Sequence, residues 1–344
     1  MADATLDATP APKRRRLDGT DEAQPTTGLA EKYKDLWLAD GNIVLQCAEG
    51  AFRVHRSLLA AQSEVFRDMF ALAIPAVDAD GLPTVQVSDD TDQMYQFLCC
   101  LIFHKYPSKN SKKYTDYILD IFELSRKYAV SIMRAACVDI LKELFPDTLE
   151  DYQHTFRKRR QLVSFRASIR CVEAASTNGL PTLLPACYLY IASDWYDHML
   201  DLKMTAEWPP EIPLAFYATI VRSMQQLSRL KREIDEGFSR EWLVEWDISR
   251  SHEHHAAQLL TYYQGSNNSG VYPEEDLTLF DPDWKATDIV DGCGTEELCT
   301  ECVTIWDKAQ REAWIIAWNG LPEKLRLGKW QTLRQQESQA SFTA

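Results

Sequence analysis

The spacing of the apolar residues between positions 43 and 70 constrains the fold more than any other feature of the sequence. Apolar side chains alternate over 43–47 and again over 52–54, with turn residues at 48–50 between them, which predicts a β-hairpin. The spacing then changes to three and four, which predicts short helices. The apolar residues that share one face of the second short helix are Val65, Phe66, Met69 and Phe70.

Alternation at 84–87 predicts a third strand, and three longer amphipathic helices follow it. Their apolar faces carry Met94, Phe97, Leu98 and Leu101, then Tyr117, Ile118, Ile121, Phe122, Ser125 and Tyr128, then Met133, Ala136, Ile140, Leu141 and Leu144. Asp116 and Asp120 lie on the opposite, polar face of the second helix. Residues 33–146 therefore predict a small α+β unit in which helices cover a short sheet.

Four segments of this unit resemble a BTB/POZ domain in their order and spacing. They are LADGNIVL at 38–45, FRVHRSLLA at 52–60, SEVFRDMF at 63–70 and LSRKYAV at 124–130. The resemblance implies a small sheet covered by helical hairpins, used for contacts with itself, with another protein or with a ubiquitin-ligase scaffold. The DGN opening at 40–42, together with a long helical extension, is similar to the large BTB family of mushroom-forming fungi.

The resemblance also implies structural roles for Asp40, His55 and Phe66. In this family the histidine commonly packs near the aspartate and ties the first strand to the helical layer. A catalytic acid/base pair is the alternative, but a buried carboxylate and imidazole can satisfy each other without a third group. Only 29–37 is available as the preceding segment that some members exchange, so a swapped dimer is not expected.

The second half of the chain predicts a mainly α-helical region over 150–335, followed by a tail at 336–344. A basic cluster at 157–160 is interpreted as a solvated helix face, with phosphate binding as the alternative. Four tryptophans are expected to pack in the core of the last helix pair: Trp306, Trp314, Trp318 and Trp330.

Three cysteines near the end of the chain raise the question of metal binding. Cys293, Cys299 and Cys302 have the spacing C-x5-C-x2-C, and histidines at 252, 254 and 255 provide a candidate fourth ligand for zinc. However, Cys299 and Cys302 also fall on the apolar stripe of one predicted helix, where free cysteine acts as a small hydrophobe. Core packing is therefore preferred, zinc is the alternative, and a redox pair is less favoured because no βαβ context surrounds it.

The N-terminal residues 1–28 lack bulky apolar side chains and predict a disordered tail. Within it, Lys13, Arg14, Arg15 and Arg16 resemble a nuclear localisation signal, and a functionless solvated charge run is the alternative. The sequence has no apolar run of the roughly 18 residues that cross a bilayer and no apolar export segment. We therefore expect an intracellular protein of the nucleus or cytoplasm, with reduced thiols and no membrane contact.

Composition and motifs limit the classes of function that the chain can have. The formal net charge of −14 disfavours nucleic-acid binding. The sequence contains no dinucleotide-binding glycine motif, nucleophile elbow or zinc-protease motif, so we expect neither an enzyme nor a cofactor. The predicted function is protein–protein interaction, through self-association or partner binding. A substrate adaptor of a cullin-type ubiquitin ligase is one alternative, and a zinc-binding or redox protein that uses the three cysteines is another.

Overall fold

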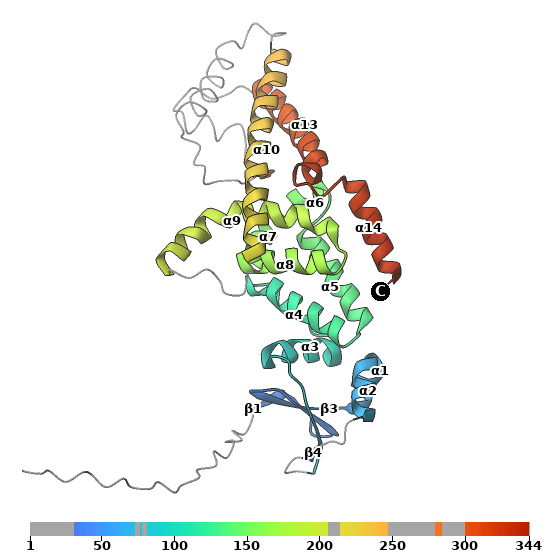
Figure 1. Ribbon diagram of the computed structural model, residues 1–344. Helices are drawn as coiled ribbons and strands as arrows, with labels where there is room; N and C mark the ends of the chain where they lie inside the picture. The colour runs from blue at the N-terminus through green and yellow to red at the C-terminus, as the bar shows by residue number, and fades with distance from the viewer. Residues whose placement is uncertain are drawn as a thin grey trace, which may run out of the picture.

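The computed structural model of the chain describes residues 31–72, 76–77, 81–205, 214–246, 279–283 and 300–343. Figure 1 shows an elongated arrangement in which the strands lie at one end and helices are stacked away from them towards the other end. Among the described helices, none is long and apolar enough to cross a membrane.

The described strands form one sheet in the order β1-β3-β2-β5-β4. Their bounds are Glu31–Trp37 for β1, Ile43–Gln46 for β2, Gly50–Val54 for β3, Ala76–Val77 for β4 and Pro83–Gln86 for β5. The predicted hairpin is confirmed, because β2 and β3 pair antiparallel with Leu45 opposite Phe52. The predicted third strand is β5, which pairs parallel with β2. No strand is predicted for β1, which pairs parallel with β3.

Arg53 fixes the turn that leads into β2. Its Nε donates to the carbonyl of Gly41 at 2.8 Å, and its Nη2 donates to the carbonyl of Ala39 at 2.7 Å. A Cβ atom on residue 41 would lie 2.8 Å from Cγ of Arg53. Glycine is therefore required here because the arginine passes directly over the turn.

Five helices complete the N-terminal domain and confirm the predicted α+β class. They are α1 Arg56–Gln62, α2 Glu64–Leu72, α3 Thr91–Phe103, α4 Lys113–Lys127 and α5 Ser131–Leu144. Asp90 caps α3, since its side chain accepts hydrogen bonds from the backbone N–H groups of Asp92 and Gln93. In Figure 1, α3 lies over the sheet and the α1–α2 pair lies beside it.

The core of this domain follows the predicted periodicity with one exception. Phe52, Phe66, Phe97 and Phe122 are almost completely buried. Val65, predicted to share the buried face of α2, is instead exposed. The nine-residue α2 lies at the surface and buries only the stripe formed by Phe66 and Phe70, so its neighbouring position faces solvent.

The rest of the chain is helical in the described ranges, as predicted. Its elements are α6 Leu149–His154, α7 Phe156–Leu162, α8 Phe165–Thr177, the 3-10 helix η1 Pro181–Leu183, α9 Leu184–Thr205, α10 Leu214–Trp246, α13 Thr300–Lys324 and α14 Trp330–Thr343. The predicted tail at 336–344 is wrong over 336–343, because these residues continue α14. The tryptophan prediction is confirmed at Trp306, Trp318 and Trp330, which are buried, while Trp314 is half-buried.

The two halves of the chain share one core. A continuous cluster of buried apolar side chains extends from Leu36 in β1 to Leu333 in α14. Helices α4 and α8 contact each other across the boundary, as Figure 1 shows. The packing is therefore continuous across the end of the N-terminal domain near residue 146, and the helical region packs against the domain that precedes it.

Candidate protein-binding surface

Five large apolar side chains of the N-terminal domain are exposed. They are Leu58 on α1, Val65 and Leu72 on α2, Phe103 at the end of α3, and Ile132 at the start of α5. Leu72 and Ile132 are each 85% exposed. We call these five residues the α1–α2 surface. Because the free energy falls when a partner covers exposed apolar groups, such a surface is a candidate binding site.

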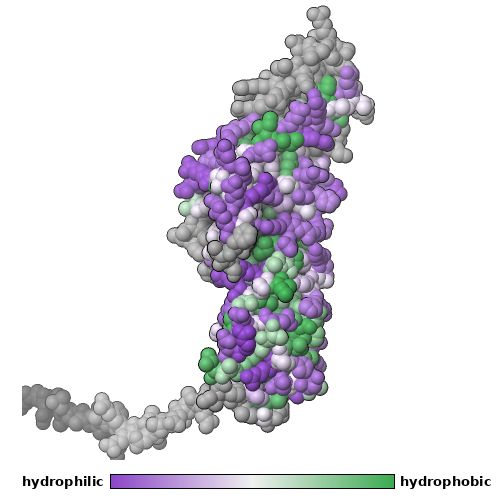
Figure 2. Space-filling view, turned by 90° about the vertical axis from the view of Figure 1, so that its right-hand side faces the viewer, coloured by the Kyte–Doolittle hydropathy of each residue, from purple (hydrophilic) through white to green (hydrophobic). Residues whose placement is uncertain are grey.

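Hydrogen bonds from the α1–α2 junction hold the surrounding elements together. The Nε2 of Gln62 donates to the carbonyl of Leu101 at 3.2 Å, near the end of α3. The Oγ of Ser63 donates to the carbonyl of Tyr128 at 2.5 Å, in the turn before α5. Figure 2, which views the side of the molecule where α1 and α2 lie in Figure 1, shows hydrophobic residues among hydrophilic ones over the lower part of this face.

Charges of both signs flank the apolar residues of α2. Arg67 lies 3.8 Å from the carboxylate of Glu64 and 3.5 Å from that of Asp68, and all three side chains are more than half exposed. These ion pairs add little stability in water. They do give the surface donors and acceptors that a protein partner can use.

Asp40 and His55 are in contact, as the resemblance implies. The Nε2 of His55 lies 3.2 Å from Oδ2 of Asp40, so the pair joins the turn before β2 to the start of α1. The carboxylate is 84% exposed, so the expectation that both groups are buried is wrong for Asp40. His55 Nδ1 is buried without a hydrogen-bond partner. A catalytic triad needs an orienting carboxylate at one imidazole nitrogen and a nucleophile at the other, and here Asp40 contacts Nε2 but no nucleophile contacts Nδ1.

Phe66 packs at the centre of an aromatic stack. Its ring lies 4.3 Å from that of Tyr128 and 5.6 Å from that of Phe70, nearly parallel to both. The Tyr128 hydroxyl donates to Asp89 at 2.5 Å, and burial raises the pKa of this hydroxyl well above its usual value. Phe66 therefore holds α2 against the end of α4, directly beneath the exposed α1–α2 surface.

A network of charged side chains joins the N-terminal domain to α8. Arg170 lies 2.7 Å from Asp120 and 3.3 Å from Asp116, and Gln93 also donates to Asp120 at 3.0 Å. Burial raises the pKa of the Asp120 carboxyl, and the nearby guanidinium of Arg170 opposes this rise. Asp116 and Asp120, which the sequence places on the polar face of α4, are therefore covered by α8.

The interpretation of the 157–160 cluster as a solvated face is wrong for Arg159. This side chain is 1% exposed, and its guanidinium carbon lies 3.8 Å from the centre of the Tyr152 ring. Its Nη1 and Nη2 donate to the carbonyl of Tyr152 at 3.5 and 3.4 Å, and Nη1 also donates to Oγ1 of Thr155 at 3.3 Å. Arg159 is therefore part of the core, where its planar group stacks on an aromatic ring.

Replacement of Arg159 by lysine is expected to lower the free energy of unfolding by about 2 kcal/mol. Lysine keeps the charge but cannot stack flat on Tyr152 or donate in the same directions. Chemical denaturation of the full chain measures the change. Arg160→Lys, at the exposed neighbouring position, is the matched control and should change stability by less than about 0.5 kcal/mol. Equal effects of the two substitutions would contradict the buried role of Arg159.

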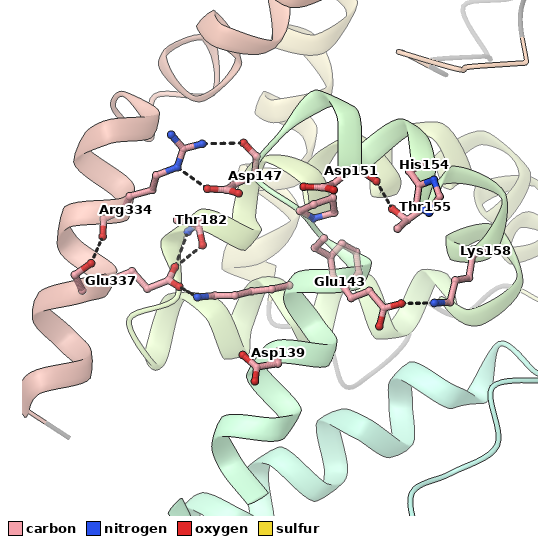
Figure 3. A pocket seen from close by; sticks show the side chains of 14 residues that line it. Asp139, Glu143, Asp147, Asp151, His154, Thr155, Lys158, Thr182, Arg334 and Glu337 are labelled. Carbon is pink, nitrogen blue, oxygen red and sulfur yellow. Dashed lines mark hydrogen bonds and ion pairs between the residues drawn. The ribbon is translucent and has the colours of Figure 1, made fainter. Parts of the chain in front are cut away.

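An open pocket of about 640 Å³ lies where α5, α6 and α7 meet η1 and α14, and Figure 3 shows its lining. Its charges are largely paired across elements. Glu337 of α14 contacts Lys142 at 2.5 Å and also binds Thr182, while Arg334 lies 2.6 Å from Asp147. These contacts hold the last helix to the end of α5. Its three hydroxyl groups, on Thr155, Thr182 and Ser338, all donate within the protein.

Several predicted site residues lie outside the described residues. Among them are the basic cluster Lys13 to Arg16, Cys293, Cys299 and the three candidate histidine ligands, and the side chain of Cys302 is likewise not described. In the parts of the chain that are described, no cluster of His, Cys, Asp or Glu is arranged to hold a metal ion.

The fold and the exposed apolar surface define a class, an α+β protein-interaction domain with a helical extension packed against it. Residues 38–144 match the family model of the BTB/POZ domain. This part of the chain is thus a BTB/POZ domain, and the family is one of protein-interaction domains. None of the curated proteins matches the chain. The match covers less than half of the 344 residues, and the helical region that follows residue 144 lies outside it.

Proposed function

We propose that the chain is a protein-interaction protein that self-associates through the α1–α2 surface of its BTB/POZ domain. The observation that carries this proposal is the exposure of Leu58, Val65, Leu72, Phe103 and Ile132. They lie on α1, on α2, at the end of α3 and at the start of α5, and hydrogen bonds join the α1–α2 junction to α3 and to the turn before α5. The aromatic stack beneath α2 and the hydrogen bonds of Gln62 and Ser63 hold the surface in a fixed shape, so little entropy is lost when a partner binds to it.

The arrangement of charges favours a second copy as the partner. A twofold-symmetric contact places each patch against itself, so the patch must be self-complementary. Glu64, Arg67 and Asp68 give α2 both signs of charge within one exposed stretch. An antiparallel pair of such helices can therefore place the arginine of each copy against a carboxylate of the other while their apolar side chains meet.

The edges of the sheet are less suitable for association. Lys34 and Asp35 are exposed on the edge strand β1, and charges on an edge oppose the addition of another strand. Strand β1 is also held in its own chain, because Tyr33 donates to Asp92 at 3.0 Å and Tyr95 donates to Asp35 at 3.2 Å. These bonds support a simple helical contact over an exchange of β1.

Glutamate at both Leu58 and Ile132 is expected to weaken self-association at least about 30-fold. Covering an unpaired charge costs about 2 kcal/mol or more, whereas the same side chains remain hydrated in the single chain. Biolayer interferometry between immobilised tagged chain and untagged chain in solution measures the affinity. Ile315→Glu on α13 is the matched control, since Ile315 is 45% exposed and Leu58 is 42% exposed.

Two outcomes of this experiment would overturn the proposal. Equal binding by the double variant and the wild type would show that the α1–α2 surface is not the contact. Failure of the wild-type chain to bind itself, with specific binding of a purified cullin scaffold in a parallel channel, would support the ubiquitin-ligase adaptor instead.

A further inference from the structure

The loop between α3 and α4 has a charge opposite to that of the whole protein. The formal net charge of the chain is −14, yet the segment 93–115, which contains this loop together with most of α3 and the start of α4, has four lysines and no aspartate or glutamate. Lys105, Lys109, Lys112 and Lys113 are all exposed. A local cluster of one sign within a protein of the other sign creates a distinct potential at that place.

Hydrogen bonds hold this loop in a defined conformation. His104 adopts a left-handed conformation, with φ of 52°, and ends α3. The backbone N–H of Lys105 donates to the carbonyl of Cys99 at 3.3 Å, and the Cys100 thiol donates to the carbonyl of Lys105 at 3.2 Å. The lysines are therefore presented by a structured loop, which reduces the entropy lost when a partner binds.

The helical region adds a fifth lysine to the same surface. Glu143 of α5 contacts Lys109 at 3.4 Å and, through its other oxygen, Lys158 of α7. These bonds lower the pKa of Glu143, mainly through Lys158, so the carboxylate stays ionised between the two lysines. We call Lys105, Lys109, Lys112, Lys113 and Lys158 the basic surface. Both halves of the chain contribute to it.

Three of these lysines make no ion pair within the described part of the chain: Lys105, Lys112 and Lys113. Lys112 precedes α4 and Lys113 is its first residue, where the helix dipole disfavours a positive charge. Lys112 and Lys113 therefore lower the stability of the helix slightly, and no ion pair within the described part of the chain offsets this loss. Such a local conflict is typical of residues that act on something outside the chain.

We infer that the basic surface binds an acidic segment of a partner protein. A short run of aspartate and glutamate touches only this surface. An extended phosphate backbone would also lie near the acidic remainder of the molecule, which carries the negative net charge. The inference goes beyond self-association, because the basic surface and the α1–α2 surface share no residue and each can be removed without the other.

The test uses the full chain and a fluorescent peptide of ten glutamates as the probe. The triple variant K105E/K112E/K113E is expected to bind the peptide about tenfold more weakly than the wild type, because three exposed charge pairs are lost. A control variant with the same charge change, K34E/R229E/K329E, should bind within about twofold of the wild type. Glutamine at the first three positions removes charge without repulsion and should give an intermediate affinity. Fluorescence anisotropy at two salt concentrations measures all four proteins.

Three results would overturn the inference. One is equal weakening in the triple variant and its control, which would reflect net charge alone. Another is no binding of the glutamate peptide by the wild type. The third is that a single-stranded DNA with ten phosphates binds more tightly than the glutamate peptide and that this binding depends on the same three lysines. That result would make the partner a nucleic acid.

Discussion

Replacement of Phe66 by alanine is expected to lower the free energy of unfolding of the full chain by about 3–5 kcal/mol. The side chain is completely buried and stacks on both Tyr128 and Phe70, so its removal leaves a cavity and breaks two aromatic contacts. The loss should appear as a lower midpoint of urea unfolding followed by circular dichroism.

The adjacent residue provides the control for this prediction. Val65 is 37% exposed on the same helix, and Val65→Ala should change stability by less than about 0.5 kcal/mol. The pair separates the role of burial from that of helix propensity, because the two positions share one helix. A small effect at Phe66, comparable with that at Val65, would mean that the stack does not hold α2 in place.

Replacement of Arg170 by alanine is expected to lower the free energy of unfolding by about 2–4 kcal/mol. It leaves Asp120, which is almost buried, without a compensating charge beneath α8. The effect should depend on pH. Burial already raises the pKa of Asp120, and loss of Arg170 raises it further. The folded variant therefore holds a proton that the unfolded chain releases. The loss of stability relative to the wild type should be small near pH 4 and should grow as the pH rises to 7.

Two further substitutions test the origin of this effect. Glu173→Ala, at an exposed position of the same helix, should leave stability nearly unchanged. Asp120→Asn in the Arg170→Ala background should recover part of the loss and remove most of its pH dependence, because the buried charge is gone. A deficit that is the same at pH 4 and pH 7 would assign the effect to lost packing rather than to Asp120.

The local features of the BTB/POZ domain were predictable from the sequence because they repeat at short range. Alternation around Leu45 and Phe52 predicts a hairpin, and the structure confirms the hairpin, with these two residues opposite each other. The spacing of Met94, Phe97, Leu98 and Leu101 specifies one buried helix face, and all four side chains are buried. Each of these inferences needs only neighbours within the same element.

The charged groups between the two halves were not predictable by the same reasoning. Periodicity assigns Asp120 and Arg159 to solvent, since a charged side chain on a polar face is normally exposed. Both are buried because a distant or neighbouring helix covers them, and pairing or aromatic stacking satisfies their charge. A surplus of basic residues in the short α7 was the only signal available for Arg159.

The last helix illustrates the same limit. Residues 336–343 carry few apolar side chains, so their sequence resembles a tail. Their helix is nevertheless attached to the molecule through Glu337, which binds Lys142 and Thr182 from segments far away in the sequence. A contact of this kind leaves no periodic pattern.

We propose that the BTB/POZ domain joins two copies of the chain through the α1–α2 surface. Sedimentation equilibrium of the full chain, over a range of concentrations from nanomolar to micromolar, tests it most directly. If the chain self-associates, its measured mass rises from 39.4 kDa towards twice that value, and glutamate at Leu58 and Ile132 keeps the mass at 39.4 kDa. A wild-type mass that stays at 39.4 kDa throughout, or a double variant that associates like the wild type, would rule out self-association through this surface.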